Sequence, residues 1–223
     1  MDNQSARRPR RRPGRPRAAA RDLRQHILDV TERLLAERRF NELAVADILH
    51  AGLVSRASFY FYFESKHAVL AELVRRAVSA GLEAARPWVE HSADDSPEAS
   101  LRRGTEAGAR LWQERAPVLR AMVENWRTDE TLSESWIELM DRFTQVTVER
   151  IEQDRASGVA PQSTLEPRVL ASALTWLGER VYYLAALGIA PFDNEQHVID
   201  ALTHIYALTI YGHPPAQHAV STR

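Results

Sequence analysis

The side chains best suited to hydrogen-bond a polyanion lie close together in the first third of the chain. Between Ser55 and Lys66, apolar residues alternate with a guanidinium, several hydroxyls and an ammonium group. Such groups pair with phosphate oxygens and with base edges in a DNA groove. The five consecutive aromatic residues 59–63 cannot share one helix face, which argues against the alternative of a purely structural aromatic stripe. We therefore expect this segment to pack on one side and to bind nucleic acid on the other.

A second basic feature is the N-terminal segment. Residues 1–21 hold eight arginines and one acid, a net charge of +7, whereas the remainder has 21 basic and 29 acidic residues, a net charge of -8. This asymmetry favours a polyanionic partner, with a solubilising tail as the alternative. The segment is rich in Arg, Pro and Ala without apolar periodicity, so we expect a disordered arm over residues 1–21.

Composition and missing motifs narrow the function classes. The 223 residues contain no cysteine, which excludes disulfides and thiolate metal sites and fits a reducing, cytoplasmic compartment. The longest nearly uncharged stretch, 181–192, is far shorter than the roughly twenty residues of a membrane helix. The chain has no Gly-rich phosphate loop, serine elbow or zinc-protease motif, and the single Glu64-to-His67 pair lacks a second copy. We expect no enzyme activity, no cofactor, no metal and no membrane association.

The elements that position the polar segment are predicted to be helices. Apolar residues at 23, 27, 30 and 34 mark one face of a first helix that starts at Asp22. A short second helix follows around residues 45–49 and breaks at Gly52, and Ser55 can cap a third. A fourth helix is expected from residue 65 to 85, stopped by Pro87. Two short helices joined by a glycine-containing turn form a helix-turn-helix pattern.

The rest of the chain also reads as helices, so the fold class is all-α. Caps and breakers place helices at about 97–115, 117–127, 131–156, 166–187 and 194–211. We therefore divide the chain into an arm at 1–21, a three-helix helix-turn-helix domain at 22–66, a helical ligand-binding and dimerisation domain at 67–212 and a tail at 213–223.

The polar segment and its surroundings resemble one known family. The matching residues are Asp47-Ile48, Ala51-Gly52, Ser55, Ser58-Phe59-Tyr60, Phe61-Tyr62-Phe63, Ser65-Lys66 and Val69-Leu70. They resemble the DNA-binding domain of the TetR family of bacterial transcriptional repressors over residues 22–75. The C-terminal helices, through Glu179-Arg180 and residues 204–212, are similar to those of a mycobacterial member.

The resemblance implies a homodimeric repressor in the bacterial nucleoid. It would bind a palindromic operator in double-stranded DNA and be released by a small, largely apolar effector. An activator or a ligand-independent DNA-binding protein of the same fold is the alternative. Two departures from the family pattern stand out: Leu53 replaces a glycine in the turn, and Ala44 replaces the usual Thr or Ser cap of the second helix.

The resemblance also assigns DNA contacts by position. Arg56 is the candidate for a bidentate contact to guanine, and Ala57 and Phe61 for contacts to thymine methyl groups. Groups assigned to phosphates are Ser55, Ser58, Tyr60, Tyr62 and Lys66. Arg15 and Arg17, in a Pro13–Arg17 segment that resembles an AT-hook core, are assigned to an A·T-rich minor groove.

The helical domain carries large aromatic residues that could enclose a ligand or simply fill a core. We expect an effector pocket lined by Trp112, Met122, Trp126, Phe143, Trp176 and Tyr183, with Asn125, Thr147 and Glu179 as polar contacts. The helices at 166–187 and 194–211 are apolar nearly all round, which requires cover on both sides. We expect a homodimer through these two helices, with a monomer in which both are central as the alternative.

Overall fold

The computed structural model describes the backbone of residues 15–89 and 96–212, and it is all-α over these residues. The described elements are nine α-helices and two short 3-10 turns, without a strand among them. This confirms the fold class. The expected tail at 213–223 and the first fourteen residues of the arm lie outside the described residues.

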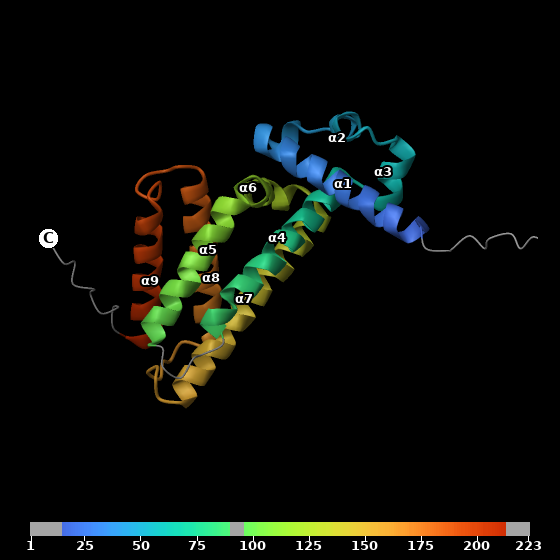
Figure 1. The fold of residues 1–223 in the computed structure, drawn as a ribbon. Helices are drawn as coiled ribbons and strands as arrows, with labels where there is room; N and C mark the ends of the chain where they lie inside the picture. The colour runs from blue at the N-terminus through green and yellow to red at the C-terminus, as the bar shows by residue number, and fades with distance from the viewer. Residues whose placement is uncertain (1–14, 90–95, 213–223) are drawn as a thin grey trace, which may run out of the picture.

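A small N-terminal unit contains the expected helix-turn-helix. Its elements are α1 (Arg15–Glu37), the turn η1 (Phe40–Glu42), α2 (Val45–Gly52) and α3 (Arg56–Tyr62). Of the predicted apolar face of α1, Ile27 and Val30 are buried and Leu23 and Leu34 are half-buried, and Leu28, which the spacing did not include, is buried as well. In Figure 1 these helices stand together above the rest of the molecule, with α3 at the outer edge.

Helix α1 begins at Arg15, seven residues before the expected start at Asp22, so residues 15–21 are helical instead of a disordered arm. The local sequence explains the earlier start. Pro16 lies in the first turn, where its missing N–H has no helical partner to lose, and three alanines with high helix propensity follow it. The apolar periodicity begins at Leu23, which is where α1 begins to pack against the core of the N-terminal unit, and not where the helix itself begins.

Helix α4 (Lys66–Val89) joins the N-terminal unit to the body. It runs through Pro87, where an end was expected. Pro87 lies in the last turn of the helix, where the absence of its N–H costs a single backbone hydrogen bond and little helix remains to be disrupted. Figure 1 shows α4 passing from beneath α1 into the body beside α7.

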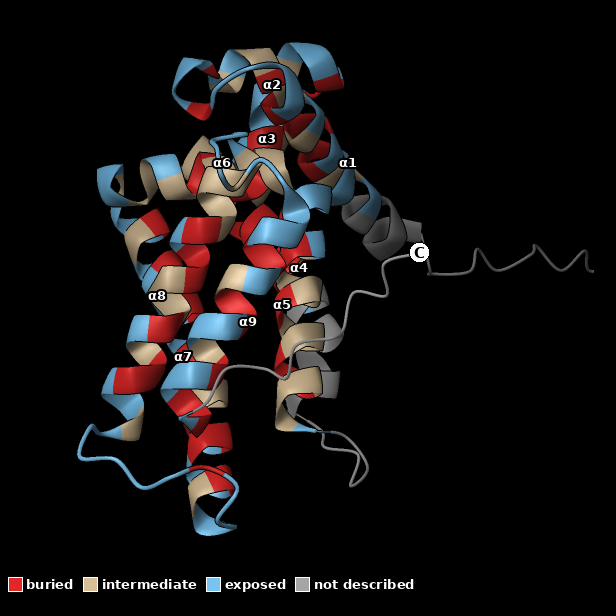
Figure 2. Ribbon diagram, turned by 90° about the vertical axis from the view of Figure 1, so that its left-hand side faces the viewer, coloured by how far each residue is buried: buried red, intermediate tan, exposed pale blue. Residues whose placement is uncertain are grey.

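The body consists of the five remaining helices. They are α5 (Pro97–Glu114), α6 (Ala116–Asn125), α7 (Glu130–Ala156), α8 (Pro167–Ala186) and α9 (Glu195–Tyr211), with the turn η2 (Trp126–Thr128) after α6. All five start and end within two residues of their expected bounds. Figure 2 shows buried residues along the inner faces of these helices and exposed residues outside.

The turn between α2 and α3 is built around a strained residue. Leu53 has φ 51° and ψ 38°, the left-handed conformation that L-residues other than glycine rarely adopt, and its side chain is 93% exposed. Gly52 precedes it and is buried, and a Cβ there would lie 3.2 Å from a methyl group of Val54. Gly52 therefore allows the turn to pack closely against Val54, and the residue with the strained left-handed backbone conformation is Leu53.

We predict that Leu53→Gly raises the free energy of unfolding by about 1 kcal/mol, because glycine adopts positive φ without a Cβ clash. Urea unfolding followed by circular dichroism measures this change. Leu53→Ala is the matched control, since it removes the exposed side chain and keeps the Cβ. It should shift the free energy by less than about 0.5 kcal/mol. A destabilised Leu53→Gly variant would contradict this explanation.

Candidate DNA interface and effector cavity

Helix α3 has a buried face and an exposed face. Phe59 is fully buried and Phe63, just after the helix, is 4% exposed, so these two aromatics anchor the segment in the core. On the other face Arg56 is exposed, Tyr60 is 47% exposed and Phe61 is 78% exposed. The expected division of the aromatic run into core and surface is confirmed.

The other predicted contacts on this segment are placed less uniformly. Ser55 and Ala57 are exposed, and Ser58 is half-buried. The Ser55 hydroxyl caps α3 by accepting the Ser58 N–H at 3.1 Å. Tyr62 is half-buried against the core, with its ring edge-on to Phe61. Arg15 and Arg17 belong to the first turn of α1, and their side chains lie outside the described residues.

Lys66 is engaged within its own domain. Its Nζ donates to the carbonyl oxygens of Phe40 at 2.9 Å and Leu43 at 2.6 Å, and it lies 4.6 Å from the centre of the Phe40 ring. Burial lowers the pKa of its ammonium, and the charge of Asp47 opposes that shift. Lys66 therefore holds the end of η1 against the start of α4, and its contact with a phosphate stays a prediction.

The missing cap at Ala44 is partly replaced by a carboxylate. Asp47 accepts the Ala44 N–H at 2.7 Å and forms an ion pair with Arg38 at 3.2 Å. The backbone hydrogen bond, followed by the Arg38 side chain, lowers the pKa of Asp47. Helix α2 thus keeps one half of a capping box, the bond from the Ala44 N–H to the Asp47 carboxylate. The sequence analysis noted the missing Thr or Ser cap but not this hydrogen bond.

The body encloses a cavity of about 170 Å³ between α4 and all five following helices. A cavity of this size is comparable to one that holds a benzene molecule. Its wall is mostly aliphatic and aromatic. The lining residues include Val78, Leu101, Leu111, Trp112, Leu119, Trp136, Leu139, Met140, Phe143, Thr147, Leu174, Thr175, Glu179 and Ile210.

Four of the residues predicted to contact an effector line this cavity: Trp112, Phe143, Thr147 and Glu179. The structure places the other five elsewhere. Met122 is fully buried in the core, and the Asn125 side chain donates to its own helix at the Ala121 carbonyl. The rings of Trp126 and Trp176 pack on each other, and Tyr183 donates to Glu124 at 3.3 Å. Helical spacing alone cannot separate these core and surface aromatics from cavity aromatics.

Two glycines of the cavity wall, Gly108 and Gly178, were not predicted from the sequence. A Cβ at Gly108 would lie 2.5 Å from the Tyr182 hydroxyl, and one at Gly178 would lie 2.5 Å from the Tyr206 hydroxyl. These glycines let two half-buried tyrosines, Tyr182 and Tyr206, extend to neighbouring helices. Nothing in the sequence pairs each glycine with its tyrosine on another helix.

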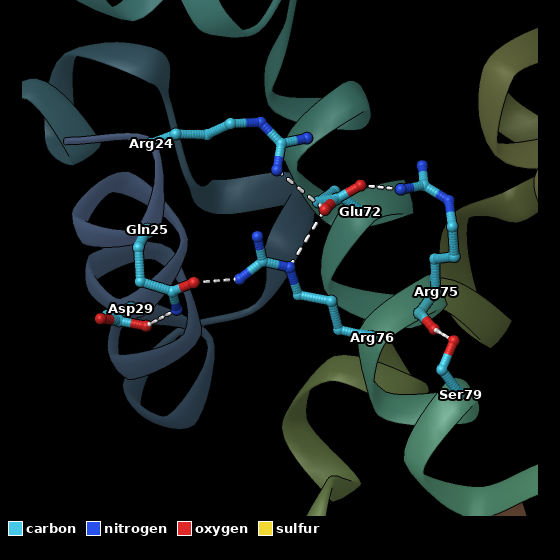
Figure 3. Close-up of polar contacts among 7 residues, drawn as sticks. All are labelled: Arg24, Gln25, Asp29, Glu72, Arg75, Arg76 and Ser79. Atoms are coloured by element: carbon cyan, nitrogen blue, oxygen red, sulfur yellow. Dashed lines mark hydrogen bonds and ion pairs between the residues drawn. The ribbon is translucent and has the colours of Figure 1, made fainter. Parts of the chain in front are cut away.

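A charged junction connects the two parts of the molecule, as Figure 3 shows. Glu72 on α4 is buried and accepts Arg24 of α1 at 2.9 Å and Arg76 at 3.0 Å, and it also pairs with Arg75. Arg76 reaches back to Gln25 of α1. One buried carboxylate therefore holds three guanidinium groups at the α1–α4 crossing.

We predict that Glu72→Gln lowers the free energy of unfolding by about 2 kcal/mol at low salt, because three neighbouring guanidiniums lose their common counter-charge. Added salt should reduce the loss, since it screens repulsion among partly exposed arginines. Chemical unfolding at two salt concentrations measures both effects. Asp29→Asn is the control, because Asp29 is exposed and accepts only from Gln25 among the hydrogen bonds of the described residues. Equal, salt-independent behaviour of both variants would refute the prediction.

None of the described helices is both long and apolar enough to cross a membrane. Two solved structures show the same fold. A TetR-family regulator from Syntrophomonas wolfei superposes with a TM-score of 0.68 at 14% identity, covering 90% of this chain and 99% of that one. Salmonella enterica GusR gives a TM-score of 0.67 at 16% identity, covering 89% and 98%.

Sequence relatives carry the comparison further. The HTH-type transcriptional regulator EthR of Mycobacterium tuberculosis is 34% identical over 202 residues, 91% of this chain and 92% of that protein. EthR of Mycolicibacterium smegmatis is 32% identical over 205 residues, 92% and 93% of the two chains. The family of tetR bacterial regulatory proteins matches residues 27–73, and the EthR C-terminal domain family matches residues 101–212.

These matches confirm both resemblances inferred from the sequence, at the N-terminal motif and at the C-terminal helices. Family and relatives are transcriptional regulators and not enzymes. The chain belongs to the TetR family of bacterial regulatory proteins, with an EthR-type C-terminal domain, and is a helix-turn-helix transcriptional regulator.

Proposed function

We propose that this regulator is a homodimeric repressor that reads a palindromic operator with α3 and is released by a small, largely apolar effector. The observation that carries the proposal is the exposed face of α3, where Arg56, Tyr60 and Phe61 project from a helix anchored by Phe59 and Phe63. In a helix-turn-helix protein this second short helix enters the major groove.

The division of labour on α3 follows from side-chain chemistry. The Arg56 guanidinium can donate two parallel hydrogen bonds to guanine, which distinguishes it from the other bases. Phe61 and Ala57 offer apolar surface to thymine methyl groups. The hydroxyls of Ser55, Ser58, Tyr60 and Tyr62, with Lys66, Arg15 and Arg17, supply contacts that set register and affinity.

A second copy is proposed to cover the outer faces of α8 and α9. Val169 on α8 is 52% exposed, and Ile205 and Leu208 on α9 are 38% and 49% exposed. These residues belong to two helices whose opposite faces are buried in the body, at Leu174, Val181, Leu202 and Ile210. Pairing α8 and α9 with their copies would bury the exposed side in a four-helix contact.

Helix α4 is proposed as the element that transmits effector binding. Val69 and Leu70 pack in the core of the N-terminal unit, and Val78 of the same helix lines the cavity. The separation of Leu70 and Val78 is about 12 Å along a continuous helix. An effector that fits only one position of α4 would shift the spacing of the two α3 helices in the dimer. It must bind the DNA-incompetent form more tightly to do so.

Specific binding is tested first with the DNA immediately upstream of the gene for this protein, by fluorescence anisotropy against a scrambled sequence of equal length. We expect binding at least about a hundredfold tighter to the natural DNA. Equal affinity for both at two salt concentrations would contradict operator recognition at that site.

We predict that Arg56→Ala relaxes the base preference at one operator position in a binding-site selection and costs about 1–3 kcal/mol on the natural site. Tyr60→Phe should instead weaken binding to all sequences alike, because it removes only a hydroxyl assigned to phosphate. Arg142→Ala, on the body, is the control and should bind as the unaltered protein does. An unchanged preference for Arg56→Ala would exclude its assignment as a base contact.

We predict that the protein is a dimer at micromolar concentration in size-exclusion chromatography with light scattering, and that Leu208→Glu converts it to a monomer. A carboxylate at the centre of an apolar contact would be desolvated without a partner. Val159→Glu is the control, because Val159 is 45% exposed but lies between α7 and α8. A monomeric starting protein would exclude the proposed α8–α9 interface.

A further inference from the structure

We propose that the effector is a primary or secondary amine with an apolar body, whose protonated nitrogen binds the Glu179 carboxylate inside the cavity. This inference rests on the proposed function, in which the cavity receives the effector, and it names the chemical class. It comes from the polar groups of the cavity wall, most of which present oxygen atoms that can accept a hydrogen bond from a ligand.

Among the residues that line the cavity, the one side chain that can carry a charge at neutral pH is the carboxylic acid of Glu179. Glu179 on α8 is 7% exposed and lies among aliphatic and aromatic neighbours. No lysine, arginine or histidine belongs to the lining residues. A buried carboxylate without a cationic neighbour in the cavity disfavours anionic ligands and favours cationic ones, because charges in apolar surroundings require a counter-charge.

The hydroxyl groups of the wall add acceptors and few donors. The hydroxyls of Tyr182, Tyr206 and Thr147 donate to the backbone carbonyls of Thr105, Leu174 and Phe143, each at 3.0 Å. Thr105 also donates to a carbonyl, that of Arg102, at 2.8 Å. Since each of these protons is already used, the oxygens of these groups can only accept from a ligand. A ligand can therefore pair with these four oxygens only by donating hydrogen bonds to them.

Arg180 satisfies Glu179 only in part. Its Nε lies 3.9 Å from the carboxylate, near the limit of an ion pair, and its guanidinium lies 5.1 Å from the centre of the Tyr183 ring. The Arg180 side chain is 56% exposed, so solvent screens its charge. Burial raises the pKa of Glu179, and Arg180 lowers it by less. A cation bound in the cavity would likewise offset the cost of burying the charged Glu179 carboxylate.

Two further groups fit such a ligand. The stacked rings of Trp112 and Tyr182 present aromatic surface to the cavity, with centres 6.4 Å apart, and aromatic faces attract cations. The Nε1 of Trp136 is buried and has no hydrogen-bond partner among the described residues. This N–H group does not interact favourably with a cation. It could donate a hydrogen bond to an ether, hydroxyl or carbonyl oxygen elsewhere on the ligand.

Three probes of matched shape test the proposal: 4-phenylbutylamine, 4-phenylbutanol and 4-phenylbutyrate. Each is titrated by calorimetry at pH 7.5 into the full-length protein, into Glu179→Gln and into Ala107→Phe. Glu179→Gln keeps the shape of the side chain and removes its charge. Ala107→Phe places a ring in the cavity, because Ala107 lines it. Circular dichroism confirms that both variants remain folded.

We expect the amine to bind about tenfold or more tighter than the alcohol, and the carboxylate to bind more weakly than either. Glu179→Gln should remove the advantage of the amine and leave the affinity for the alcohol unchanged, and Ala107→Phe should weaken all binding. Equal binding of amine and alcohol that Ala107→Phe abolishes would overturn the proposal and leave the effector cavity intact. Tightest binding of the carboxylate would also overturn it. If none of the three probes binds, both the amine proposal and the assignment of this cavity as the effector site are overturned. The proposed operator binding is tested separately, by the anisotropy measurement.

Discussion

Helix α4 packs in the N-terminal unit at one end and in the body at the other, and so fixes how the two parts sit together. Its buried residues Val69, Leu70, Val74 and Val78 belong to one continuous apolar cluster that also contains Phe59 on α3 and Met140 on α7. The DNA-binding unit and the upper part of the body therefore share a core. Close-packed interiors do not deform gradually, so a displacement of α4 must repack both parts together. This shared core would couple a ligand bound in the proposed effector cavity to the helix that carries the candidate DNA contacts.

Two buried carboxylates are treated in opposite ways along this route. Glu72, at the crossing of α1 and α4, is surrounded by three arginines and holds the two helices in one arrangement. Glu179, in the cavity, has one distant and largely exposed partner. The first site is electrostatically complete within the protein and specifies geometry. The second is incomplete, and a molecule from outside can complete it.

The sequence predicted those features that depend on neighbours along the chain. Periodicity and caps located all the helices of the body, and the aromatic run 59–63 has the buried side and the exposed side that its sequence predicted. Features that depend on contacts between distant helices were not accessible. The sequence suggests that Lys66 is a surface cation, yet its Nζ donates hydrogen bonds to the backbone carbonyls of Phe40 in η1 and Leu43 just after it. Trp126 and Trp176 read as ligand contacts, yet they pack on each other. The early start of α1 followed from propensity, which a search for apolar periodicity ignores.

The contacts of Gly108 and Gly178 with the hydroxyls of Tyr182 and Tyr206 bear on how ligand range could change during evolution. At each position one methyl group decides whether a tyrosine can stay against the neighbouring helix or must turn aside, and both tyrosines line the cavity. Gly108 and Gly178 line the cavity as well, so the positions of both tyrosine rings, and with them the cavity volume, depend on two backbone positions that lack a Cβ. Related regulators could acquire smaller effectors, or lose ligand response altogether, by single glycine-to-alanine steps that leave the DNA-reading surface untouched.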